Sequence, residues 1–184
     1  GAVHAPDGRV VAWFSRGAAS AVATKLAIAE HGDAVVVACI ALDAEHEDSA
    51  RFAADCEAWF GQPITYLRSE RYADTWAVWE GERFLVGPQG APCTGILKKA
   101  VRHTFQRPDD RQVFGYTAEE ANRAERFRAN DPGVDILTPL IDRGLTKGDC
   151  HALLDSQGIK RPAMYDLGYA NNNCIGCPKG GMGY

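Results

Sequence analysis

Short β-branched runs alternate along this chain with longer stretches whose apolar residues recur at helical spacing. The short runs predict strands at 10–14, 34–42, 64–67, 112–115 and 136–140. The second of them, AVVVACIAL, is apolar almost throughout, which is typical of a strand buried on both faces of a parallel sheet. The longer stretches predict helices over 20–30, 49–60 and 94–105 and after Thr117 and Thr146. This alternation predicts an α/β protein, with a Rossmann-like three-layer fold, a mostly parallel twisted sheet and helices on both faces.

Polar residues mark two helix starts and leave one stretch without a period. Thr117 is followed by Glu120 and Thr146 by Asp149, in the spacing of a capping box. Residues 72–92 show neither a helical nor a strand period, and we expect them to be irregular.

The predicted organisation is one domain followed by a short tail. We expect residues 1–165 to form the α/β domain, which binds its ligand at the carboxyl ends of the strands. Residues 166–184 are rich in glycine and asparagine, and we expect them to pack on the same domain as an irregular, cysteine-containing tail.

The composition is that of an ordinary globular protein. Of the 184 residues, 46% are hydrophobic and 24% are charged, and the net charge of −4 does not favour nucleic-acid binding. No apolar stretch approaches the ~20 residues that span a membrane, and residues 1–6 lack the charged and apolar regions of a signal peptide. We therefore expect a cytoplasmic protein without membrane contact, whose six cysteines are reduced thiols or metal ligands. A homo-oligomer is a separate expectation.

The turn after the first predicted strand has the composition of an anion-binding loop. It consists of Ser15, Arg16, Gly17, Ala18, Ala19 and Ser20, and it leads directly into a helix. Small residues let backbone N–H groups approach an anion, and the helix adds its positive N-terminal end. The serines and the arginine add hydrogen-bond donors. From these residues alone, a phosphate-binding turn and a tight turn without a ligand both stay open.

Two groups of charged residues are further candidates. The acidic stretch 43–48 follows the buried strand and is interpreted as a solvated loop, with a metal site around His46 as the alternative. Basic residues gather on two predicted helices, either as solvated charges or as a site that converges on an acidic substrate: Lys98, Lys99 and Arg102, and Arg123 with Arg126.

The cysteines divide into two sets. Three lie on predicted core faces and are interpreted as packing residues: Cys39, Cys56 and Cys150. Cys174 and Cys177 form a C-x-x-C motif in a loop, and Cys93 starts a predicted helix, where the dipole lowers the pKa of a thiol. A zinc site with a fourth ligand such as His103 or Cys150, and a metal-free thiol pair, are both open from the residues.

An ordered series of motifs resembles a known family. The series is Pro92-Cys93-Thr94, then Lys98-Lys99, then VFGYTAEEANRAERF at 113–127, then NNNCIGCPKGG at 171–181. It resembles the phosphoadenosine phosphosulfate (PAPS) reductase family, and within it the short members found in phage and bacterial genomes. That family lies in the adenine nucleotide α-hydrolase-like superfamily, which includes the N-type ATP pyrophosphatases. The resemblance extends from Trp13 to Tyr184.

The resemblance implies an adenine nucleotide, ATP or PAPS or its relative APS, bound at the turn 15–20. It assigns Leu42 and Asp43 to the surroundings of adenine and ribose. It also assigns basic residues to the phosphate or sulfate groups, with Arg123 the preferred candidate, beside Lys98, Lys99 and Gly115. The family loop has the form S-G-G-x-D-S, so Arg16 replaces a glycine and Ala19 an acid. The lost acid disfavours magnesium-assisted ATP cleavage and suits the reductase branch better.

The resemblance also implies an iron–sulfur centre. Cluster-containing members carry a cysteine pair where this chain has Cys93 alone, and a C-x-x-C where it has Cys174 and Cys177. Three thiolates would hold a 4Fe–4S cluster with one iron open, and zinc is the alternative. We assign these cysteines, together with Arg123, to the catalytic site.

The reaction implied is sulfonucleotide reduction or nucleotide-dependent sulfur transfer, with a thiol reductant or a sulfur-donor protein as partner. The Glu-Cys-Gly-Leu-His type motif of the sulfonucleotide reductases does not occur in the sequence. Two alternatives are a catalytically degenerate nucleotide-binding or regulatory module, and a nucleic-acid thiolation factor. The latter would hold tRNA or DNA on the helix with Lys98, Lys99 and Arg102.

Overall fold

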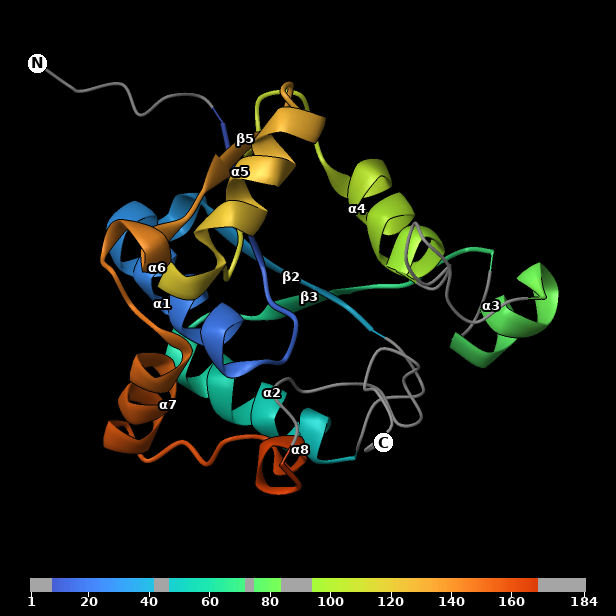
Figure 1. The fold of residues 1–184 in the computed structure, drawn as a ribbon. Coiled ribbons are helices and arrows are strands. Elements are labelled where there is room, and N and C mark those ends of the chain that lie inside the picture. Colours follow the sequence, from blue (N-terminus) through green and yellow to red (C-terminus); the bar gives the residue numbers. More distant parts are fainter. Residues whose placement is uncertain (1–7, 42–46, 72–74, 84–93, 169–184) are drawn as a thin grey trace, which may run out of the picture.

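The computed structural model describes residues 8–41, 47–71, 75–83 and 94–168 (Figure 1). A five-stranded parallel sheet has the order β3-β2-β1-β4-β5. Its strands are β1 Val10–Trp13, β2 Val35–Ile40, β3 Ile64–Leu67, β4 Arg111–Val113 and β5 Asp135–Leu137. The chain first builds the sheet outward from β1 to β3, then crosses back and adds β4 and β5 on the other side of β1. This reversal creates a topological switch point between β1 and β4, where open α/β sheets bind ligands.

Helices cover both faces of the sheet, so the predicted three-layer α/β fold is confirmed. On one face α1 (Ala18–His31) packs against α2 (Asp48–Phe60), α6 (Pro139–Asp142) and α7 (Lys147–Ser156). The other helices are α3 Thr75–Glu82, α4 Ala100–Phe105, α5 Ala121–Asn130 and α8 Ala163–Asp166. A π-helical turn, Thr94–Lys99, precedes α4, and the 3₁₀ turn Ala118–Glu120 precedes α5.

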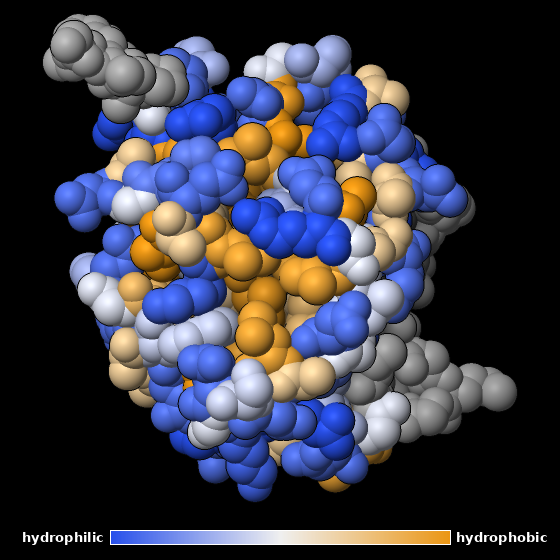
Figure 2. All heavy atoms as spheres, turned by 90° about the vertical axis from the view of Figure 1, so that its left-hand side faces the viewer, coloured by the Kyte–Doolittle hydropathy of each residue, from blue (hydrophilic) through white to orange (hydrophobic). Residues whose placement is uncertain are grey.

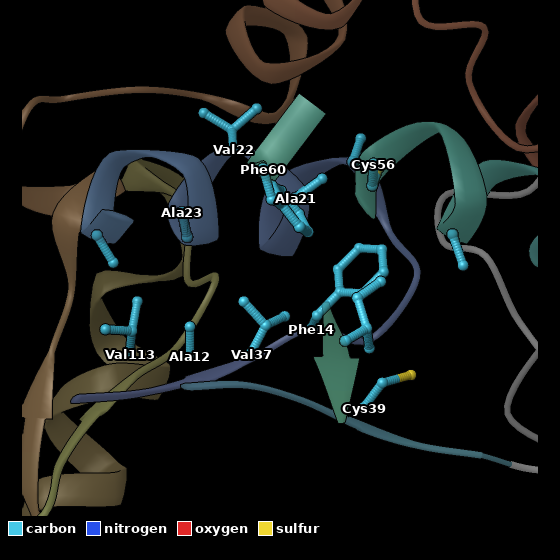
Figure 3. Packing of buried hydrophobic residues seen from close by; sticks show 14 of the residues in the cluster. Ala12, Phe14, Ala21, Val22, Ala23, Val37, Cys39, Cys56, Phe60 and Val113 are labelled. Carbon is cyan, nitrogen blue, oxygen red and sulfur yellow. The ribbon is translucent and has the colours of Figure 1, made fainter. Parts of the chain in front are cut away.

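The side chains of β1 alternate between two cores. Val10, Ala12 and Phe14 point into the large apolar core beneath α1 and α2, where the Phe14 ring meets Phe60 edge-on at 5.5 Å (Figure 3). Trp13 points the other way and meets the Phe105 ring of α4 edge-on, with 5.9 Å between the ring centroids. The two cores place helices on both sides of the strand that leads into the candidate turn.

A smaller apolar cluster covers the far side of β2. Val78 of α3 and Leu97 of the π-helical turn are fully buried, and Ile40 packs against them. The near-continuous apolar run of β2 is therefore covered on both faces, as its sequence predicts.

Several element boundaries differ from the sequence prediction. β5 ends at Leu137, and Leu140, expected in the strand, belongs to α6 because Pro139 at the first helical position favours a helix start. α1 begins at Ala18 rather than at Ser20. α3 is a helix within the stretch expected to be irregular.

The two predicted helix starts are confirmed. Both capping boxes are formed, and at α7 the Asp149 N–H donates to Thr146 Oγ1 at 3.2 Å. The three cysteines predicted to be core residues are buried: Cys39, Cys56 and Cys150.

The face that carries α1, α6 and α7 shows an apolar strip bordered by hydrophilic side chains (Figure 2). Within the described part of the chain, no helix has the length and apolar character needed to cross a membrane. A homo-oligomer stays a prediction.

Candidate functional site

Two serines cross-link the turn between β1 and α1. The Ser15 N–H donates to Ser20 Oγ at 3.0 Å, and Ser20 Oγ–H donates to the Gly17 carbonyl at 3.1 Å. The two hydroxyl oxygens are also 3.0 Å apart. Ser20 is buried and Ser15 is exposed. Ser20 therefore shapes the turn, and Ser15 is the serine that faces outward.

The turn ends at the N-terminus of α1, whose first N–H groups are the donors that an anion would use. Gly17 is the N-cap, it provides no capping side chain, and the first helical turn contains no acidic residue. The positive end of the helix is thus not neutralised by its own side chains. The Ala18 N–H donates to the Tyr165 hydroxyl oxygen at 3.2 Å.

Arg16 holds an unusual backbone conformation in this turn. Its φ of 60° lies in the left-handed region, which a glycine adopts without steric cost. This explains the glycine at this place in the family loop that the turn resembles. The Arg16 guanidinium lies 5.5 Å from the ring centroid of Tyr66, on β3. The side chain thus reaches from the end of β1 toward β3, along the carboxyl edge of the sheet.

Gly115 follows β4 and abuts the turn. A Cβ at Gly115 would lie 2.7 Å from both Cα and N of Ser20, a distance that real Cβ atoms do not reach. Only glycine fits without displacing the start of α1. The structure therefore brings the predicted residue Gly115 to the predicted turn, at the switch point between β1 and β4.

The preferred basic candidate, Arg123, lies on α5 beside this loop. Its guanidinium pairs with Glu120 and lies 5.5 Å from the ring centroid of Tyr116, the residue after Gly115. Burial raises the pKa of the Tyr116 hydroxyl, and the nearby arginines oppose that shift. Arg123 is largely exposed, so its charge is available to a ligand at the cost of the pair with Glu120.

Lys98 and Lys99 are exposed in the π-helical turn, but Arg102 does not lie with them on the surface. Only 9% of Arg102 is exposed. Its guanidinium lies 4.9 Å from the ring centroid of Phe127 and 5.6 Å from that of Phe114, and burial lowers its pKa. The expectation that Arg102 is a surface charge, either solvated or facing an acidic ligand, is wrong, because aromatic rings from α5 and the end of β4 cover this side chain.

The buried cysteines are packing residues. Burial raises the pKa of the Cys56 thiol to about 12 and that of Cys150 to about 11, so neither is a thiolate at neutral pH. Within the described ranges, no group of three His, Cys, Asp or Glu side chains could hold a metal ion. The predicted site residues Leu42, Asp43, Cys93, Cys174 and Cys177, as well as His46, lie outside the described residues.

Sequence reasoning missed Tyr165. Its hydroxyl contacts the turn across 147 positions of chain, and it lies in a four-residue helix that carries no local sign of a ligand. Only the folded structure brings it to Ala18.

The sheet order and the switch point belong to a PAPS reductase-like fold, which two solved structures share. The PAPS reductase from Candida auris, solved as a phosphate complex, superposes with a TM-score of 0.60 at 10% sequence identity, over 88% of this chain and 78% of the reductase. The U34-tRNA thiolase NcsA from Methanococcus maripaludis, solved with its 4Fe–4S cluster, superposes with a TM-score of 0.52 at 13% identity. This superposition covers 84% of this chain and 58% of the thiolase. No family model and no curated protein matches the sequence.

Proposed function

We propose that this protein is an enzyme that binds an adenine nucleotide at residues 15–20 and catalyses sulfonucleotide reduction or nucleotide-dependent sulfur transfer. One observation carries the proposal: the N-terminus of α1, free of acidic side chains, meets Gly115 at the switch point of the sheet. The phosphate in the Candida auris reductase structure supports an oxyanion as ligand of this fold.

The turn and the basic residues have separate roles in this proposal. The N–H groups of the first turn of α1 bind the phosphoryl or sulfuryl oxygens, and the exposed Ser15 hydroxyl adds a donor. Arg123, released from Glu120, neutralises charge that develops in the transition state. Lys98 and Lys99, which are exposed in the π-helical turn, are further candidates for contacts with the acidic groups of the ligand.

Cys93, Cys174 and Cys177 would hold the iron–sulfur cluster. Three thiolates would leave one iron of a 4Fe–4S cluster open, whereas a structural zinc site would need a fourth protein ligand. Cys150, one candidate for that ligand, is buried in the apolar core under α1 and α7 with its pKa raised. When bound, the cluster would supply redox or sulfur chemistry.

The first test is nucleotide affinity measured by calorimetry with PAPS and with ATP. Gly115→Ala places a Cβ against the Ser20 backbone, so we expect affinity to fall at least about ten-fold, or about 1.4 kcal/mol. Gly133→Ala is the matched control, because a Cβ there meets nothing within 4 Å. Equal affinity for the two variants and the wild type would remove the turn from the proposal. Circular dichroism of both variants checks that the fold is retained.

The second test is turnover, using protein purified without oxygen. Sulfite release from PAPS with a dithiol reductant supports reduction, and about four irons with four sulfides per chain support the cluster. Incorporation of sulfur into tRNA instead of sulfite release favours thiolation, the candidate that the NcsA likeness supports. Nucleotide binding without either reaction favours the degenerate module, in line with Arg16 and Ala19.

A further inference from the structure

The Tyr165 hydroxyl is positioned where an anion oxygen would bind. It accepts the hydrogen bond of the Ala18 N–H at 3.2 Å, and a Cβ at Gly17 would lie 3.3 Å from it. Backbone N–H groups in the first turn of a helix are the donors that hold a phosphate oxygen. Tyr165 thus places a neutral oxygen on one of the donors that the turn offers to a ligand.

The Tyr165 ring is held against α7. It meets the His151 ring edge-on, with 4.6 Å between centroids and 83° between planes. His151 Nδ1 is buried, and no residue in the described part of the chain hydrogen-bonds to it. Burial, together with the nearby Arg161 and Lys147, lowers the pKa of His151 and so favours the neutral ring. The edge-on contact with this ring orients the tyrosine.

Polar contacts tie the segment that carries Tyr165 to the start of α2. The Ala163 N–H donates to Asp48 Oδ2 at 2.7 Å. Arg51 donates to the Lys160 and Arg161 carbonyls at 2.9 and 3.2 Å, and it also pairs with Asp48 at 2.7 Å. These contacts are partly exposed, and exposed ion pairs contribute little individually. The segment is therefore fastened by groups that can separate at modest cost.

We propose that the Tyr165 hydroxyl is a built-in ligand of the anion site, which a phosphoryl or sulfuryl oxygen must displace, and that this displacement releases α8 from the turn. This inference rests on the proposed function, because it concerns the same site. It makes Tyr165 a residue that sets affinity by competition, and it couples occupancy of the turn to the position of α8.

The test compares inorganic phosphate binding by the wild type and Tyr165→Phe in calorimetry. Phenylalanine keeps the ring on His151 and removes the competing oxygen, so we expect about three- to ten-fold tighter binding. His151→Phe is the control: it changes the neighbouring ring, leaves the hydroxyl in place and should stay within about two-fold of the wild type. Weaker binding by Tyr165→Phe would make the hydroxyl a ligand contact and overturn the inference, while the proposed function would stand. Absence of binding by the wild type and both variants would overturn both.

A second measurement follows the release of α8. In hydrogen exchange, saturating phosphate should speed exchange of the backbone amides of residues 163–168 in the wild type. Asp48→Asn loosens the tie to Ala163, so it should tighten phosphate binding in the wild-type background and leave Tyr165→Phe unchanged. Slower exchange in 163–168 on adding phosphate, or equal effects of Asp48→Asn in both backgrounds, would overturn the coupling.

Discussion

The two sides of the sheet are covered by side chains of different chemical character. The side under α1, α2 and α7 is a continuous apolar core in which ring and methyl contacts fill the space (Figure 3). The side under α4 and α5 is aromatic and polar: Trp13 Nε1 donates to Gln112 Oε1 at 2.9 Å, and Arg9 donates to Asp110 at 2.8 Å. The buried guanidinium of Arg102 lies against the Phe114 and Phe127 rings on that same side.

This difference determines which side of the sheet fixes the geometry of the candidate site. The apolar side fixes α1, and with it the turn, through packing that leaves no room for a Cβ at Gly115. The aromatic and polar side also uses charged side chains for support, so a basic residue there is a ligand candidate only where its side chain is exposed. Arg102 and Arg123 lie near one loop, yet only Arg123 is exposed.

The largest effect on the free energy of unfolding is expected at Arg102, whose buried charge distinguishes the aromatic and polar side of the sheet from the apolar side. Arg102→Ala should lower the free energy of unfolding by about 2–3 kcal/mol, because it removes the side-chain packing and the contacts with both rings. Arg102→Met keeps the packing and removes the buried charge, so it should stay within about 1 kcal/mol of the wild type. Urea unfolding of the two variants measures both values.

Lys98, an exposed residue in the π-helical turn before α4, provides the control for Arg102. Lys98→Ala should change the free energy of unfolding by less than about 0.5 kcal/mol. If Arg102→Ala matched Lys98→Ala, the arginine would be a surface residue and the basic helix would regain its place as a candidate for nucleic acid.

The turn, the capping boxes and the apolar core faces were predictable from the sequence, but the surroundings of Arg102 and Tyr165 were not. The turn at 15–20 and the capping box at Thr146 follow from local spacing, and the fold follows from the alternation of strand and helix periods. Arg102 has the same sequence signature as an exposed base, because burial depends on rings that other elements supply. Tyr165 needs the closure of the whole chain to reach Ala18, which no local pattern encodes.

The buried Cys56 thiol tests the apolar core through the pH dependence of the free energy of unfolding. Its thiol has a pKa raised by burial to about 12, above its value in the unfolded chain, so the folded state holds the proton longer. Its contribution to stability is complete below the unfolded pKa of ~8.5 and falls as the pH rises toward the folded pKa, by about 1.4 kcal/mol per pH unit. Urea unfolding at about pH 8 and about pH 10, one on either side of the unfolded pKa, should therefore show a smaller loss of stability for Cys56→Ala than for the wild type. Equal losses would indicate that water reaches this thiol.

The smallest effect is expected at Arg16, where the turn leaves the family pattern. At a φ of 60° any residue with a Cβ is strained, and glycine is not. Arg16→Gly and Arg16→Ala both lose the contact with Tyr66, so the difference between them isolates the backbone. We expect Arg16→Gly to be more stable than Arg16→Ala by about 1 kcal/mol in urea unfolding, despite the greater freedom of glycine in the unfolded chain. If alanine were equally stable, the turn would not require the left-handed conformation, and the arginine could not be a replaced glycine in structural terms.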